Sequence, residues 1–354
     1  MSWLPNWTRR VKFTVDQTDI DAPLTSFPTL LSIGTLSGRL GDNLGFIFSA
    51  MQNDANKLKI AVTTNDGTTQ CYVEVEKWDT VNNKAILWAN IPSINDTVNT
   101  DLYLYYDPNV NNNSLYVGTV TSTQGKAVWD SNFVGVYHLG ETSGTIIYDS
   151  TSNTINGTIS GVCTLNATGK IGSGVLFNAG QISFGPNPSA WNVSTITAEA
   201  WIWTNYAYSE DGRIITLGTG ATYPWLLTHH VTAPAGGLAM AGTLASHATK
   251  RSNTIVTSGV WHYGVGQRNL EALYLNAILG TLTVTDSWSL EANAKIGSRG
   301  SAKWFRGTID EVRISNINRS VVWIKASYES ERDDLIDWGL EETNFRRSLR
   351  RRGG

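Results

Sequence analysis

The sequence is poor in cysteine and in charge, and both shortages narrow the classes of protein that it can encode. Its 354 residues include two cysteines, Cys71 and Cys163. Two isolated cysteines define neither a disulfide framework nor a thiolate metal site, and we expect both to be reduced and buried in strands. Only 16% of the residues are charged and the formal net charge is −3, which argues against a general nucleic-acid binder. No apolar run approaches the length of a membrane span.

The sequence also lacks the motifs of common catalytic sites. It has no Ser/His/Asp arrangement with a nucleophile elbow, and GTGAT at 218–222 lacks the lysine and the helix of a phosphate loop. Glycoside hydrolysis with retention needs two carboxylates about 5 Å apart. The nearest pair, Glu74 and Glu76, lies in an alternating strand whose charged face we expect to be solvated. We therefore predict no enzymatic activity, no catalytic residues and no organic cofactor.

A secretory signal is also missing from the opening MSWLPNWTRR, which has no apolar core and carries charge at once. We expect the protein to stay where it is made or to leave by another route, such as virion assembly followed by lysis. This interpretation predicts a location on a virion surface. The alternative is an extracellular or cell-surface protein exported by a route that the sequence does not reveal.

Turn-forming residues are abundant, with 33 glycines among them, and they separate short runs of strand-like sequence. RRVKFTVD at 9–16 alternates apolar and polar residues with the period of a half-buried strand. We predict further strands at 25–34, 44–51, 71–79, 84–94 and 101–108, and then at 174–178, 182–185, 196–204, 212–218, 260–267, 272–278, 294–298 and 307–315. The only helix predicted is VVWIKASYES at 321–330. The fold class is therefore all-β.

The chain divides at a polar stretch, NVNNNSLYVGTVTSTQGK, which we interpret as a linker over 109–126. Residues 1–108 are then an N-terminal β-sandwich. Residues 127–343 are a larger β-sandwich that ends with the predicted helix, and 344–354 form an arginine-rich tail.

Four segments of the second half carry a family resemblance: VWDSNFVGVYHLGETSGTIIYDSTSNTINGTISG (128–161), GKIGSGVLFNAG (169–180), STITAEAWIWT (194–204) with SGVWHYGVG (258–266), and FRGTIDEVRISNINRS (305–320). In this order they resemble the laminin-G-like, concanavalin A-like lectin/glucanase family. The resemblance implies a jelly-roll sandwich. The first half, through WLPNWTRRVKFTVD, LTSFPTLL and LYLYYDP, resembles a domain of unknown function that precedes such lectin-like modules in microbial and phage proteins. That resemblance implies a virus structural protein.

Two turns depart from the family pattern. The chain has Asn276-Ala277 where family members usually have Asp-Gly, and it has Asn178-Ala179-Gly180 where they favour aspartate before glycine. We expect these changes to reshape both turns and to remove two acidic ligands from any carbohydrate site carried over from the family.

The resemblance implies that Asp310, in GTIDEVRIS, helps to bind a structural calcium ion with the loop around Asp149. Calcium takes six to eight oxygen ligands, which such loops supply. Asp310 and Glu311 are adjacent in a predicted strand, so we expect their side chains to point to opposite faces and not to form an acid/base pair. The alternative to a metal site is a salt bridge or hydrogen bond, for example from Glu311 to Arg313 or Arg319.

Aromatic residues in predicted loops are the candidates for sugar binding, because Trp and Tyr rings stack on the apolar faces of sugars. Most of the 14 tryptophans must lie in the core. The candidates for contact with a carbohydrate are Tyr206, Tyr208, Tyr223, Trp225 and Trp304.

The tail NFRRSLRRRGG holds five arginines in eleven residues. We interpret it as an arm that docks on an acidic protein surface or on nucleic acid. The alternatives are that it folds back on 329–342, which contains seven acidic residues, or that it is solvated and has no role. The arginines assigned to docking are Arg346, Arg347, Arg350, Arg351 and Arg352.

These features together suggest a non-enzymatic virion surface protein of a tailed virus: a head decoration, fibre or tail-associated protein. We expect its partners to be other virion proteins, copies of itself and a host cell-surface glycan bound by the lectin-like module, without a specific nucleic acid. One alternative is a cellular carbohydrate-binding adhesin, and another is a glycoside hydrolase. A fold does not determine a function.

Overall fold

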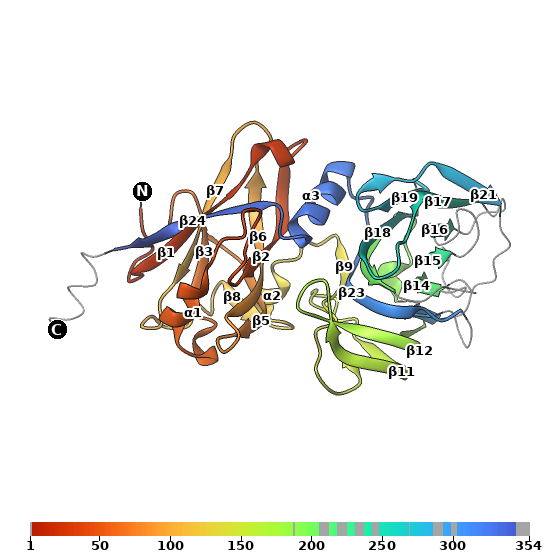
Figure 1. Ribbon diagram of the computed structural model, residues 1–354, viewed down its shortest axis with the longest axis horizontal. Coiled ribbons are helices and arrows are strands. Elements are labelled where there is room, and N and C mark those ends of the chain that lie inside the picture. Colours follow the sequence, from red (N-terminus) through yellow and green to blue (C-terminus); the bar gives the residue numbers. More distant parts are fainter. Residues whose placement is uncertain are drawn as a thin grey trace. The chain divides into compact units, whose positions relative to one another are not determined.

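The computed structural model describes residues 2–186, 188–204, 212–217, 225–230, 237–242, 248–268, 270–285, 293–298 and 303–344. They form two compact units (Figure 1). The first unit contains the chain up to Asp130 and the described residues from Lys325 onward, and the second unit is Ser131–Ile324. No helix in the described part of the chain is both long enough and apolar enough to span a membrane.

The first unit is built from two sheets and short helices. Its five-stranded sheet has the order β24 (Ile336–Thr343), β1 (Arg9–Val15), β7 (Thr100–Tyr106), β3 (Ile60–Thr64), β4 (Gln70–Cys71). Its four-stranded sheet has the order β2 (Leu24–Ile33), β6 (Lys84–Ile94), β5 (Val73–Asp79), β8 (Val117–Thr119). The helices are α1 (Gly45–Met51), α2 (Thr123–Lys126) and α3 (Val321–Glu331), and the division between the units falls within α3.

The predicted alternation in the first strand is confirmed, because Val11, Phe13 and Val15 are fully buried. The strand predicted at 44–51 is wrong, since this segment is α1. The buried residues of α1 are Ile47, Phe48 and Met51, a spacing that places them on one side of a helix. The helix predicted at 321–330 is confirmed as α3.

The C-terminal strand belongs to the first unit. The predicted boundaries instead placed it in the lectin-like domain, 127–343. β24 pairs antiparallel with β1, and Glu342 is opposite Arg10 in that register. The buried Arg10 guanidinium bonds to Glu342 and lies 3.8 Å from the ring centre of Tyr103. The stretch 109–126 also lies within the first unit, where β8 pairs in parallel with β5.

Among the described residues of the second unit, fifteen strands form one hydrogen-bonded network. The main path is β20 (Ile278–Leu279), β19 (Ala272–Leu275), β18 (Trp261–Gln267), β13 (Thr197–Trp203), β23 (Arg306–Ser315), β12 (Ser173–Pro186), β22 (Asn293–Ile296), β14 (Gly212–Leu217), β15 (Trp225–His230), β16 (Gly237–Gly242), β17 (Ala248–Ile255), β21 (Leu282–Thr285). Off this path, β9 (Phe133–Tyr137) pairs with β23, and β11 (Gly157–Thr168) pairs with β12 and with β10 (Ile146–Ile147).

One hydrophobic core holds the second unit together. Ile202 of β13 and Ile309 of β23 share this core with Ile215 of β14 and Leu227 of β15, which lie on the other half of the strand path. The network therefore folds over on itself as a sandwich, with apolar side chains between its layers. The predicted fold class, all-β with two β-sandwich units, is confirmed.

The turn at Asn276-Ala277 has a tight hairpin geometry, and the expectation that its sequence reshapes it relative to the family stays a prediction. Both residues have positive φ, 52° and 62°, and Leu275 pairs directly with Ile278. Two positive φ values in a two-residue loop are typical of a type I′ turn. The Asn276 side chain accepts a hydrogen bond from the Tyr263 backbone N–H at 2.9 Å.

Candidate functional site

Asp310 and Glu311 lie at a β-bulge in β23. The register between β13 and β23 shifts between Glu199 and Trp201, and Glu311 has a φ of 49°. As a result, Val312 and not Glu311 enters the hydrophobic core together with Ile309. The prediction that the faces alternate regularly through this pair is therefore wrong, because a bulge inserts one residue and changes the facing of those that follow.

Glu311 is fully buried between Arg313 and His138. Its Oε2 accepts a hydrogen bond from Arg313 Nη2 at 2.7 Å, and its Oε1 lies 2.9 Å from His138 Nδ1. Burial by itself raises the pKa of Glu311, but His138 and Arg313, through charge and hydrogen bonds, hold that pKa below its usual value. The predicted ion pair of Glu311 with Arg313 is confirmed.

Arg319, the other partner suggested for Glu311, makes different contacts. Its guanidinium carbon lies 4.3 Å from the ring centre of Phe133 and 4.0 Å from that of Trp323, and its Nε donates to the Ser315 hydroxyl at 3.0 Å. Such stacking of a cation on aromatic faces is stabilising when the group is shielded from water.

The two acids predicted to bind calcium have separate protein partners. Asp149 Oδ1 accepts the N–H groups of Val136 and Thr151, and its Oδ2 accepts the Thr151 hydroxyl and the Ile155 N–H. Burial raises the pKa of Asp149, while these hydrogen bonds act to lower it. Asp310 Oδ2 accepts the N–H of Ile171 at 2.9 Å.

A carboxylate offers about four lone-pair positions. The four donors around Asp149 occupy that number, so this arrangement leaves no free position on Asp149 for a cation. The role seen for Asp149 is to fix its own loop, as aspartates often do in turns. A calcium ion held by Asp149 and Asp310 stays a prediction.

Glu199 is another buried acid of the second unit, and its position also suits a structural role. It accepts a hydrogen bond from the Tyr263 hydroxyl. The Tyr263 ring lies 5.3 Å from the ring of Trp201, which is 2% exposed. Lys170 places its Nζ 5.0 Å from the centre of that indole.

The predicted sugar-binding aromatics are only partly within the described structure. Trp304 is half-buried and lies between β22 and β23. Trp225 begins β15, but its side chain lies outside what the structure describes. The other predicted residues lie outside the described residues: Tyr206, Tyr208, Tyr223, Arg346, Arg347, Arg350, Arg351 and Arg352.

The expectation that Glu74 and Glu76 share a solvated face is wrong for Glu74, which is fully buried. The Trp129 indole N–H donates to Glu74 at 2.7 Å, and that of Trp88 donates to Glu76 at 2.8 Å. A register shift between Val75 and Lys77 breaks the simple alternation of β5. These acids anchor two tryptophans inside the first unit.

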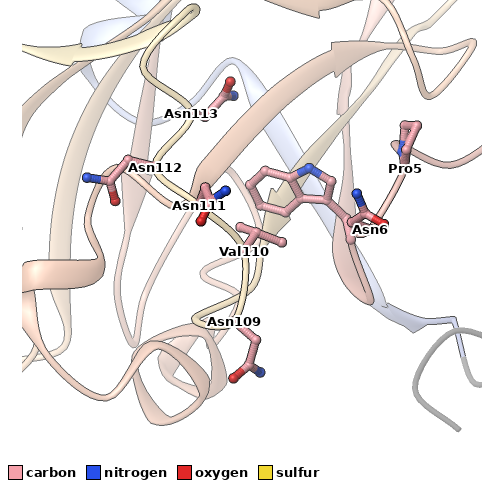
Figure 2. Close-up of a pocket in the computed structure, with 8 residues that line it drawn as sticks. Pro5, Asn6, Asn109, Val110, Asn111, Asn112 and Asn113 are labelled. Atoms are coloured by element: carbon pink, nitrogen blue, oxygen red, sulfur yellow. The ribbon is translucent and has the colours of Figure 1, made fainter. Parts of the chain in front are cut away.

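A groove that the sequence did not predict lies in the first unit (Figure 2). It has a volume of about 300 Å³. The residues that line it are Pro5, Asn6, Trp7, Asn109, Val110, Asn111, Asn112 and Asn113. Figure 2 shows the loop 109–113 along one side of the groove and Pro5 and Asn6 on the other. The sequence signal for it is the run NVNNN at 109–113, which by composition predicts the start of a linker.

The loop of the groove is fixed at both ends. Asp107 accepts the backbone N–H of Asn109 at 2.9 Å and the hydroxyl of Thr8 at 2.7 Å. Asn113 donates from its side chain to the carbonyl of Ile60 at 3.0 Å and to Gln70 Oε1 at 2.7 Å. The loop is therefore held against β3 and β4 and is not a free linker.

Trp7 forms the apolar wall of the groove and is set in an aromatic cluster. Its ring meets Tyr105 edge to face at 5.9 Å, and Trp3 meets the same tyrosine at 5.6 Å. Trp7 is 7% exposed. In contrast, Asn109, Asn111 and Asn112 are exposed, and their side-chain amides form no hydrogen bond with any residue in the described ranges.

Comparison with known proteins gave no matching family model. No curated protein matches the chain. Among solved structures, domain 4 of AbnA, a GH43 extracellular arabinanase from Geobacillus stearothermophilus, in complex with arabinotriose, is 17% identical with a TM-score of 0.43, covering 55% of this chain and 98% of that domain.

Two further structures are similar over part of the chain. The receptor binding domain of botulinum neurotoxin mosaic serotype C/D is 14% identical with a TM-score of 0.41, covering 56% of this chain and 50% of that one. The Trypanosoma rangeli sialidase in complex with the inhibitor DANA is 12% identical with a TM-score of 0.41, covering 73% and 44%. This chain therefore spans half or less of those two proteins. Similarity at this level carries no argument about function.

Proposed function

We propose that this protein is a non-enzymatic virion surface protein of a tailed virus: a head decoration, fibre or tail-associated protein. Its lectin-like second unit binds glycans on the host cell surface. The observation that supports a binding role over catalysis is that three acids of that unit are buried and hydrogen-bonded to protein donors. Asp149, Glu199 and Glu311 are at most 1% exposed, and each accepts hydrogen bonds from protein donors.

A glycosidase needs two carboxylates that reach the bond to be cleaved from either side. A carboxylate that is buried and already bonded to protein donors does not reach a sugar chain in this geometry. Glu311 would also have to leave Arg313 and His138, which would leave uncompensated charges in the interior at a cost of several kcal/mol. The three buried acids of the second unit therefore favour a fixed scaffold.

The role in a virion is supported by features of the sequence. The first feature is the resemblance of both halves to modules of phage and microbial proteins. The second feature is the arginine-rich segment at 344–354. Arginine forms bidentate bonds to carboxylates and phosphates, so such a segment suits docking on an acidic surface of a larger assembly.

The first test measures binding of the full chain to a panel of bacterial and archaeal surface polysaccharides, with calcium and with EDTA, and measures release of reducing sugar in the same mixtures. We expect saturable binding without sugar release. Loss of binding in EDTA would support the predicted calcium ion. Sugar release that disappears when one acid is neutralised would overturn the non-enzymatic assignment, and mass spectrometry of purified virions that lacked the chain would overturn the assignment to the virion.

A further inference from the structure

We infer that the asparagine groove of the first unit is a second binding site, and that its ligand is a short neutral saccharide or the neutral end of a longer one. The groove is lined by Pro5, Asn6, Trp7 and 109–113. It lies outside the lectin-like second unit, so this inference does not depend on the function proposed for that unit.

The chemical class of the ligand follows from the groove's lining, in which five of eight residues are asparagines and none is charged. A carboxamide has an acceptor oxygen and two donor hydrogens. A sugar hydroxyl likewise both donates and accepts, so a set of amides complements a polyol. An anion or a cation would need a charge of opposite sign, which this lining does not provide.

The amides available to a ligand are those that the fold does not use. Asn113 is committed to Ile60 and Gln70, whereas the side chains of Asn109 and Asn111 are exposed and form no hydrogen bond with the described protein. Figure 2 shows Val110 and Asn111 on the side of the loop nearer to Asn6. Asn111 therefore borders the hollow with an unpaired amide, and Asn109 belongs to the same lining.

The apolar part of the lining suits the C–H faces of a sugar ring. Trp7, Val110 and Pro5 supply these surfaces, and the edge-to-face contact of Trp7 with Tyr105 fixes the orientation of the indole. The Trp7 indole N–H makes no hydrogen bond within the described ranges and can donate to a hydroxyl. A pocket with apolar walls and a few placed polar groups is the usual form of a small-ligand site.

The site is also organised before any ligand arrives. Asp107 fixes the start of the loop and Asn113 fixes its end, so binding orders few backbone torsions and loses little entropy. A volume of about 300 Å³ is at the lower end of the range for ligand pockets, about 300–1,000 Å³. This size favours one or two sugar residues.

The test uses the full chain and a panel of neutral di- and trisaccharides built from glucose, galactose, mannose and N-acetylglucosamine, with sulfated and carboxylated sugars for comparison. Affinity is measured by calorimetry, and the side-chain amide NMR signals of Asn109 and Asn111 report where the sugar binds. We expect saturable binding of at least one neutral sugar, with both signals shifted. The Asn109→Ala/Asn111→Ala variant should bind it about tenfold more weakly or worse, because two hydrogen-bonding groups are removed.

The matched control is Asn65→Ala, an exposed asparagine of the same unit outside the groove, which should bind as the wild type does. Neither groove side chain bonds to the described protein, so the melting temperature of the double variant should be unchanged. Equal affinity of the double variant and the wild type would place sugar binding elsewhere and overturn the inference. Binding only of charged sugars, preference for a short extended peptide, or no binding at all would also overturn it.

Discussion

Arg313 Nη2 lies 2.7 Å from Glu311 Oε2, and both side chains are at most 2% exposed. The two residues are two apart in β23 and share an interior site with His138. Glu311 lies in a β-bulge of β23. The bulge allows Glu311 to bond to Arg313 and His138 while Ile309 and Val312 of the same strand enter the core.

Neutralising Glu311 should therefore destabilise the second unit. For Glu311→Gln we expect a loss of about 3–5 kcal/mol in the free energy of unfolding, because the Arg313 charge stays buried without its partner. Urea unfolding at pH 7 measures the change. As a control, Glu329→Gln breaks an exposed pair with Arg332 and should cost less than about 1 kcal/mol. Similar losses for both variants would contradict the prediction.

Asp66 should make stability depend on pH in the acidic range. Its carboxylate accepts the Thr69 hydroxyl and the N–H groups of Thr68 and Thr69, and these bonds hold its pKa well below the usual value. A lowered folded-state pKa means that the stabilisation is fully present above the unfolded pKa, about 4, and is lost as pH falls through the folded value.

For Asp66→Asn we expect a loss of about 1 kcal/mol at pH 7, by analogy with side chains that cap a backbone turn. The free energy of unfolding of both proteins should be measured from pH 7 downward. The difference between variant and wild type should disappear below a pH of about 4. A gap that is constant across this range would mean that ionisation of Asp66 does not contribute.

Ala277 occupies a backbone conformation that favours glycine. Its φ is 62° in the two-residue turn between β19 and β20. Ala277→Gly removes a steric cost of about 1–2 kcal/mol and adds an entropic cost of about 0.5–1 kcal/mol. We therefore expect a net gain of about 0.5–1 kcal/mol in the free energy of unfolding. Ala272→Gly, within β19, should lose stability, and a loss in both variants would contradict the assignment of the turn.

Trp338 should stabilise the first unit, although it comes near the end of the sequence. It is 6% exposed and its ring lies 5.3 Å from that of Phe13. Trp338→Ala should cost about 3–5 kcal/mol. Hydrogen exchange followed by mass spectrometry should show lost protection in β1 and unchanged protection in β13. Equal loss in both strands would contradict the division into two units.

The sequence by itself determined the fold class and most of the strands. The alternation of Val11, Phe13 and Val15 is a local property that records which side of a strand is buried. The helix at 321–330 was also predicted correctly from the sequence. The segment 44–51 was not, because a short apolar run fits a strand or a helix and only its packing through Ile47 and Met51 decides between them.

Only the tertiary structure decided how distant segments combine. The bulge at Glu311, the burial of Glu74 and the return of β24 to β1 each depend on a partner strand that no local pattern names. The asparagines of 109–113 resemble a linker in composition, and they line a groove because Asp107 and Asn113 tie that loop to the first unit. Local periodicity encodes which residues are buried, whereas register and long-range hydrogen bonds determine which side chains meet.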